Sequence, residues 1–149
     1  MKILVSACLL GKACRYDGAS RPCAHIIELK ERHTIIPVCP EVMGGLPTPR
    51  PASEIQADGR LVNILGKDVT AEYHRGAEAV LALAREHGTT VAILKDKSPA
   101  GGKGRIYDGS FTGAELLCEC PSVSSRRWHN RQHTPHRCSG SCGSCNVHR

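Results

Sequence analysis

The chain has 149 residues, of which 40% are hydrophobic and 3% aromatic, and this length and composition fit one domain with a modest aliphatic core. No apolar run approaches the roughly 20 residues of a membrane-spanning helix, and the first residues are interrupted too soon for a secretory signal, so we expect a cytoplasmic protein. The net charge of +6 is concentrated in residues 118–149, which hold five Arg and one Glu, and it therefore gives little information about the rest of the chain.

The first part of the chain alternates between predicted strands and a predicted helix. Residues 2–7 and 34–38 are short apolar runs typical of buried strands, and residues 24–33 fit a short helix between them. Pro37 lies inside the second run and indicates an edge strand, because proline cannot donate to a neighbouring strand. Residues 40–60 hold four prolines and a glycine pair, and they predict a long ordered loop of functional importance.

The next part continues the alternation. Residues 61–64 predict a short strand, and Thr70 is predicted to be the N-cap of a helix that ends at Gly88. The apolar face of this helix consists of Tyr73, Ala77, Val80, Leu81 and Ala84. Residues 90–95 predict a further strand, and residues 96–110, rich in glycine and proline, predict a second long loop.

This alternation indicates the fold class and the place of the site. Strands alternating with helices predict a single α/β domain with a mostly parallel sheet and helices on both faces, a Rossmann-like arrangement. In open α/β sheets, the functional site forms beyond the carboxyl ends of the strands. We therefore expect the loops that follow three of the strands, residues 8–18, 39–50 and 96–109, to converge.

These loops hold residues suited to metal and proton chemistry. Cys8 and Cys39 each follow a predicted strand, and thiolates suit soft metals and iron–sulfur clusters. Glu41 lies beside one thiol and can move protons, and Ser98 and Arg50 add a hydroxyl and a cation. Each residue also has a structural alternative, namely buried core thiols, a helix cap or an ion pair with an arginine for Glu41, and an ordinary turn at Ser98. For Arg50, an ion pair that fastens the loops and a contact with an anion or substrate both stay open.

Short motifs in the same loops resemble a known family. They are SACLLG with RYDG, CPE with GGL and PR, LKDKSP, and IYDG. In this order, they resemble the small bacterial 2-thiouracil desulfurase family over about residues 1–117. Each motif alone is weak, but the ordered set is specific.

The resemblance implies an enzyme that removes sulfur from a thiolated pyrimidine or a similar small thioamide. It also implies a [4Fe–4S] cluster, held by three cysteines, whose open iron takes the sulfur of the base. By position, Cys8 and Cys39 are implied cluster ligands, Glu41 is the implied catalytic acid/base, and Ser98 is implied to orient substrate or water.

The chain departs from the family pattern at the third ligand. Where the family has Ser-Pro-Ser-Cys-Gly, this chain has Gly101 in place of the cysteine and Ala100 in place of the second serine. This change predicts an impaired cluster unless another thiol replaces the missing one, and Cys14 is close to Cys8 in sequence. The alternative is a non-catalytic member of the same scaffold that binds a metal or a small molecule.

Residues 118–149 do not continue the family pattern, and we expect them to be separate from the domain at 1–117. The family has a glycine-rich segment and a last helix there, whereas this chain has a tail rich in Cys, His and Arg without apolar periodicity. Read one base later, possible codons of residues 126–131 encode Gly-Gly-Gly-Ile-Thr-Ala, which resembles the missing segment. Our hypothesis is that the tail is either a frameshift product or disordered.

The tail also permits two other interpretations. The spacing Cys138-x3-Cys142-x2-Cys145 occurs in radical S-adenosylmethionine enzymes, but only four residues follow it, so we reject that class. Its cysteines and histidines could instead bind zinc. Nucleic-acid binding through the arginines and Trp128 is the least favoured interpretation, because the sequence indicates no nucleic-acid-binding fold.

Overall fold

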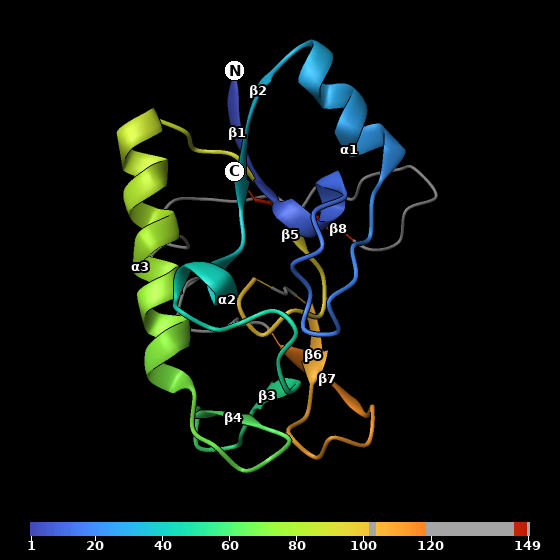
Figure 1. Cartoon of the computed structure of the whole chain (residues 1–149), viewed down its shortest axis with the longest axis vertical. Helices are drawn as coiled ribbons and strands as arrows, with labels where there is room; N and C mark the ends of the chain where they lie inside the picture. The colour runs from blue at the N-terminus through green and yellow to red at the C-terminus, as the bar shows by residue number, and fades with distance from the viewer. Residues whose placement is uncertain (102–103, 119–144, 149) are drawn as a thin grey trace.

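The computed structural model describes residues 1–101, 104–118 and 145–148 (Figure 1). A four-stranded sheet forms its centre, in the order β2, β1, β5, β8. The strands are β1 (Lys2–Ser6), β2 (Thr34–Val38), β5 (Ala92–Lys95) and β8 (Cys145–His148). β1 is parallel to both β2 and β5, and β8 is antiparallel to β5. The expected α/β fold with a mostly parallel sheet is confirmed, and β2, the strand with Pro37, lies at an edge as predicted.

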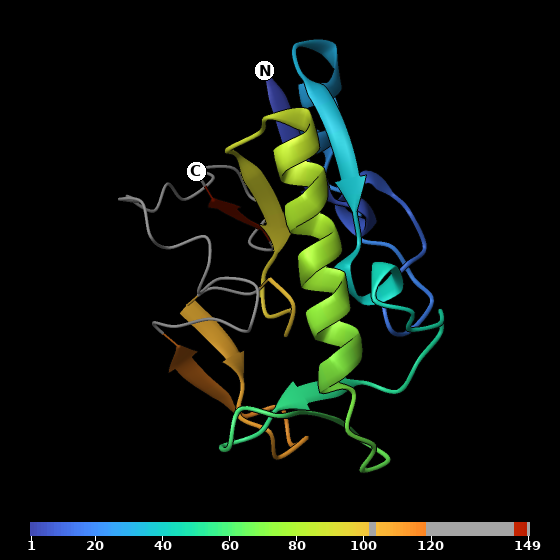
Figure 2. The ribbon, with the colours of Figure 1, turned by 90° about the vertical axis from the view of Figure 1, so that its left-hand side faces the viewer.

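Helices cover both faces of the sheet. α3 (Thr70–His87) lies on one face, and α1 (Ala24–Glu28), which continues as the short 3-10 helix η2 (Leu29–Glu31), lies on the other (Figures 1 and 2). The core on the α1 face contains Ile3, Val5, Leu9, Ile26 and Ile93. The core on the α3 face contains Leu4, Ile36, Val38, Val80 and Ala84. Because both faces are covered, β1 is apolar on both sides, and this explains its continuous apolar run.

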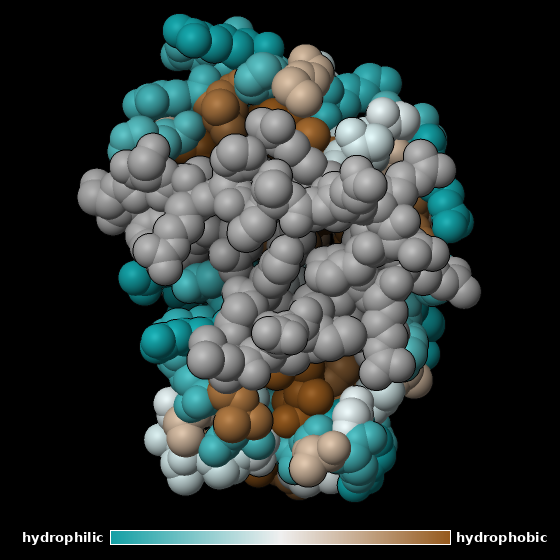
Figure 3. Space-filling view, turned by 180° about the vertical axis from the view of Figure 1, so that it is seen from behind, coloured by the Kyte–Doolittle hydropathy of each residue, from teal (hydrophilic) through white to brown (hydrophobic). Residues whose placement is uncertain are grey.

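Two antiparallel hairpins extend the molecule beyond one end of the sheet (Figure 1). One pairs β3 (Ser53–Ile55) with β4 (Leu61–Asn63), and the other pairs β6 (Gly104–Tyr107) with β7 (Glu115–Cys118). The predicted strand at 61–64 is therefore present, but it belongs to a hairpin and not to the main sheet. Seen from behind, the described surface shows hydrophobic residues at the upper and lower parts of the molecule (Figure 3).

The start of α3 differs from the prediction. Thr70 is the first helical residue and Val69 is the N-cap. The Thr70 Oγ1 accepts a hydrogen bond from the Leu61 N–H at 2.9 Å, and the Thr70 N–H donates to Asp68 Oδ1 at 2.9 Å. Asp68, and not Thr70, thus supplies a side-chain acceptor for an N–H group at the start of the helix. The predicted end is confirmed, since Gly88 has the left-handed conformation (φ 61°) of a C-terminal cap.

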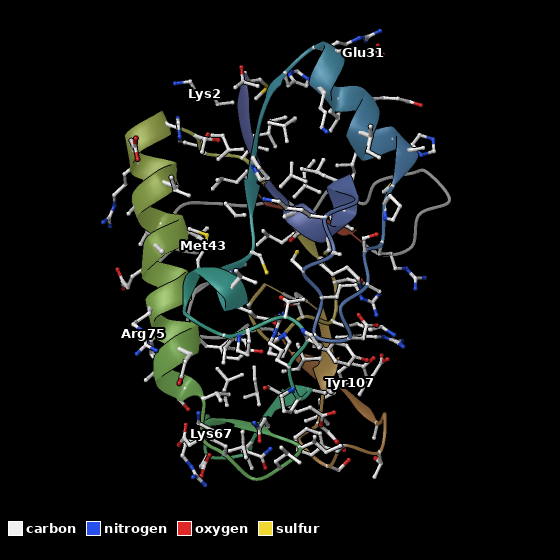
Figure 4. All side chains as sticks on the ribbon, viewed as in Figure 1. Lys2, Glu31, Met43, Lys67, Arg75 and Tyr107 are labelled. Carbon is white, nitrogen blue, oxygen red and sulfur yellow. The ribbon has the colours of Figure 1, made fainter. Side chains whose placement is uncertain are left out.

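The two predicted long loops are not continuous loops. The second contains β6, and the first contains β3 and a short helix, α2 (Pro40–Met43). α2 packs closely against α3: a Cβ on Gly44 would lie 1.9 Å from the Glu72 carbonyl oxygen, and one on Gly76 would lie 1.8 Å from the Pro40 carbonyl oxygen. Figure 4 labels Met43 and Arg75 on either side of this contact. So short a helix depends on tertiary packing, which local sequence patterns do not reveal.

The tail contributes the last strand of the sheet. β8 pairs with β5 in a register that runs from Ala92 opposite His148 to Lys95 opposite Cys145. The segment of the frameshift hypothesis, residues 126–131, lies outside the described residues, as do most of the tail cysteines and histidines. Within the described part of the chain, no helix has the length and apolarity needed to cross a bilayer.

Candidate functional site

A cleft of about 650 Å³ lies beyond the carboxyl ends of β1, β2 and β5. All three predicted loops line it, so the expected convergence is confirmed. The lining residues include Cys8, Cys14, Cys39, Glu41, Arg50 and Ser98. The structure thus brings together the five site residues predicted from the sequence and adds Cys14. Gly101 is not among the lining residues.

Three thiols meet at this cleft, one from a 3-10 helix, one from the junction of a strand and a helix, and one from a loop. Cys8 lies in the 3-10 helix η1 (Ala7–Leu10) directly after β1, Cys39 lies between β2 and α2, and Cys14 lies in the loop after η1. The Cys39 thiol donates a weak hydrogen bond to the Cys14 carbonyl oxygen at 3.7 Å. Burial raises the pKa of the Cys8 thiol, and a nearby Cys39 thiolate raises it further. Burial, followed by the charge of Cys39, raises the pKa of Cys14 to about 12.

This donor set suits an iron–sulfur cluster better than a single ion. Among the side chains that the structure describes, no three Cys, His, Asp or Glu groups lie close enough to hold one metal ion. A four-iron cubane is larger than an ion, so its ligands need to line a shared cavity rather than meet at a point. Three thiols in one cleft fit this requirement in kind and in number. Thiolates repel each other in a buried cleft, and a bound cluster would relieve that repulsion.

A buried ion pair holds a carboxylate beside the thiols. Glu41, on α2, accepts hydrogen bonds from Nε of Arg50 at 2.7 Å and from its Nη2. The side chains of Glu41 and Arg50 are only 13% and 4% exposed. The second oxygen of Glu41 accepts a hydrogen bond from the Ser98 hydroxyl at 3.3 Å. The carboxylate therefore joins the second and third loops and presents an acceptor to the cleft.

Arg50 uses its whole guanidinium group within the protein. Besides the two bonds to Glu41, Nη2 donates to the Cys14 carbonyl oxygen at 3.1 Å. Nη1 donates to the Pro47 carbonyl oxygen at 3.1 Å and to Thr48 Oγ1 at 3.3 Å. An arginine has five N–H donors, and these five bonds engage all of them. This count favours the loop-fastening alternative for Arg50 over direct contact with a substrate.

The third loop presents Ser98 through a tight turn. Lys97, the residue before it, has φ 54°, a left-handed conformation that side-chain-bearing residues rarely adopt. The Gly101 N–H donates to the Ser98 carbonyl oxygen at 3.2 Å and closes the turn. A Cβ on Gly101 would lie 3.0 Å from Leu94 Cδ1 and 3.2 Å from its Cβ. The position that the family pattern assigns to a cysteine therefore faces the Leu94 side chain.

Tyr73 and Glu54 also line the cleft, although no sequence motif marks either of them as functional. Tyr73 is on the predicted apolar face of its helix, and burial together with the charge of Glu41 raises the pKa of its phenol. Glu54, on β3, is buried and accepts hydrogen bonds from the Gly109 N–H at 2.9 Å and the Phe111 N–H at 3.0 Å. It holds the turn that follows β6. No local pattern marked Glu54, because its partners lie more than fifty residues away.

Comparisons with known proteins agree with the motifs. The family model of 2-thiouracil desulfurase matches residues 3–126, which extends past the point where the motif pattern stops. YbbK, a protein of Bacillus subtilis (strain 168), is 38% identical over 123 residues, which is 76% of this chain and 82% of the relative. The solved structure of the [4Fe–4S]-dependent thiouracil desulfidase TudS is similar with a TM-score of 0.74 and 44% identity, over 85% of this chain and 83% of that one.

Proposed function

The chain belongs to the 2-thiouracil desulfurase family, and we propose on this basis that it removes sulfur from a thiolated pyrimidine or a similar small thioamide with the help of an iron–sulfur cluster. The observation that carries the proposal is the cleft in which thiols, Glu41 and Ser98 meet. Its volume suits a small ring-shaped substrate. We also propose a cytoplasmic location, where cysteines stay reduced.

Cys8 and Cys39 are the proposed cluster ligands from the first and second loops. A [4Fe–4S] cluster bound by three thiolates leaves one iron free, and that iron would bind the sulfur atom of the substrate. Both residues follow hydrogen-bonded parallel strands of the main sheet, β1 and β2, so their backbones are held firmly. Both thiols lose their protons when they bind, so cluster assembly releases protons to the solvent.

Glu41 is the proposed acid/base, and Ser98 is the proposed positioning residue beside it. The overall exchange consumes one water and releases hydrogen sulfide, because the carbon–sulfur double bond becomes a carbon–oxygen double bond. Glu41 would take a proton from the attacking water and return it to the departing sulfur. The Ser98 hydroxyl, 3.3 Å from the carboxylate, would hold that water or an oxygen or nitrogen of the base. We assign Arg50 to orient the Glu41 carboxylate.

Among the residues that the structure describes, those that line the cleft all lie within residues 1–117. We propose a division into a desulfurase-like domain at 1–117 and a tail at 118–149. The tail still contributes β8 to the sheet, so its removal would expose the edge of β5.

The direct test is the release of sulfide from 2-thiouracil by anaerobically reconstituted protein. We expect sulfide and uracil in equal amounts from the wild type. Glu41→Gln keeps the shape and the acceptor for Arg50 but loses the base, so we expect its rate to fall roughly 100-fold or more with the iron content unchanged. Glu28→Gln, on the exposed surface of α1, is the matched control.

A second candidate function is binding without catalysis, which Gly101 favours because the third family ligand is absent. Cluster-loaded wild type that releases sulfide no faster than Glu41→Gln would support this candidate and overturn the enzymatic one.

A further inference from the structure

The third loop lines the cleft but carries no thiol, because Gly101 stands where the family pattern has a cysteine. Gly101 has no side chain, and the Cβ direction at this position points at Leu94 on β5. Residues 1–101 nevertheless place three thiols at the cleft, because Cys14 lines it together with Cys8 and Cys39. Resting on the proposed function, we propose that Cys14 is the third cluster ligand in this chain and that the first loop thus supplies two of the three.

The backbone of Cys14 is held in place for this role. Its carbonyl oxygen accepts two hydrogen bonds, from Nη2 of the buried Arg50 at 3.1 Å and from the Cys39 thiol at 3.7 Å. Its N–H donates to the Lys12 carbonyl oxygen at 2.9 Å. These bonds keep Cys14 beside Cys39 before any cluster binds.

The side chain of Cys14 has the surroundings of a ligand more than those of a core residue. It is partly buried, packs at the margin of the core on the α1 face, and lies within hydrogen-bonding reach of the Cys39 thiol. Cys23 is the contrasting case, since it is 4% exposed within the same core and does not line the cleft. Cys14 and Cys23, which both lie in the first part of the chain, therefore have different environments.

Cys145 is a competing candidate for the third cluster ligand. It lies opposite Lys95 in the β5–β8 register, and Lys95 lines the cleft. We favour the first loop, because Cys14 itself lines the cleft and its carbonyl oxygen accepts hydrogen bonds from both the Cys39 thiol and Arg50. The experiment below therefore includes a Cys145 variant.

The first test counts iron and acid-labile sulfide per chain after anaerobic reconstitution of the full chain. We expect about four of each in the wild type, and less than about one in Cys14→Ser, matching Cys39→Ser. Cys23→Ala and Cys145→Ser should keep the wild-type content. Circular dichroism verifies that each variant is folded.

The second test needs no substitution and so does not depend on the folding of a variant. The wild type is alkylated with iodoacetamide with and without its cluster, and the modified cysteines are quantified by mass spectrometry. We expect the cluster to slow alkylation of Cys14 by roughly tenfold or more, together with Cys8 and Cys39, because a metal-bound thiolate is a poor nucleophile. The rate at Cys23 should not change.

The outcomes separate this inference from the proposed function. If Cys14→Ser keeps a full cluster, or if Cys14 is alkylated equally fast in loaded protein, the inference is wrong and the proposed function stands. Loss of iron in Cys145→Ser alone would assign the third position to the tail. If the wild type holds no cluster at all, both proposals are wrong.

Discussion

The two walls of the cleft are built in different ways. On one wall, α2 carries Glu41 and directly follows Cys39, and it packs against α3 through close backbone contacts at Gly44 and Gly76. On the other wall, Ser98 is presented by a turn whose neighbour at Gly101 is the flexible side chain of Leu94. The first wall has little freedom to move, whereas the second can adjust. This difference explains how a ligand can be lost from the third loop while the geometry of Glu41 is kept.

Removing Arg50, the cation that pairs with Glu41 on the first wall, should have the largest effect on stability. Arg50→Met leaves the carboxylate of Glu41 buried without its partner and frees the Cys14 carbonyl oxygen. We expect the free energy of unfolding to fall by about 3–5 kcal/mol, as measured by urea denaturation. The exposed Arg60, paired with Asp58, is the control, and Arg60→Met should have little effect. Equal losses in the two variants would contradict the role of Arg50 as the fastener of the loops.

The close contact between α2 and α3 should have the next largest effect on stability. Gly76→Ala places a methyl group where the Pro40 carbonyl oxygen lies, although alanine is intrinsically the better helix former. We expect a net loss of about 1–3 kcal/mol in thermal unfolding and a weaker cluster, because α2 has to shift. Ala82→Gly, at an exposed position on α3, should cost about 1 kcal/mol and leave the iron content unchanged. Stabilisation by Gly76→Ala would show that the helices are not in close contact.

The thiols predict a pH dependence for the cluster-free chain. Burial and the nearby Cys39 raise the pKa of the Cys14 thiol from its ordinary value of 9.0 to about 12, so folding favours the protonated thiol. This contribution to stability is complete below pH 9 and is lost as the pH rises towards 12. Denaturation of wild type and Cys14→Ser across this range should show a smaller decline in the variant, whereas parallel curves would contradict the prediction.

The smallest effect should come from the second wall. Gly101→Ala makes the same chemical change as Gly76→Ala, but the new methyl group would lie 3.0 Å from Leu94 Cδ1, which can rotate away, and 3.2 Å from Leu94 Cβ, where a small shift relieves the contact. We expect a loss below about 1 kcal/mol and no change in iron content. A loss as large as that of Gly76→Ala would show that both walls are equally rigid.

Much of the fold could be predicted from the sequence. The runs at 2–7 and 34–38 became β1 and β2, and the periodic segment up to Gly88 became α3, because an apolar run or an apolar helical face marks the residues that pack into the core. α2 and β3 could not be predicted in the same way. They are three or four residues long, and their stability comes from contacts with α3 and β4.

For the candidate site too, the sequence revealed some features and the tertiary structure revealed others. The sequence by itself singled out Cys8, Cys39, Glu41 and Ser98 as candidate site residues through the ordered motifs, and their catalytic roles stay predictions. Only the tertiary structure decided that Arg50 donates its hydrogen bonds to groups within the protein, that Gly101 faces Leu94, and that Cys14 lies beside Cys39. Motifs record residue types along the chain, whereas a hydrogen bond or the direction of a Cβ depends on segments that meet only when the sheet has formed.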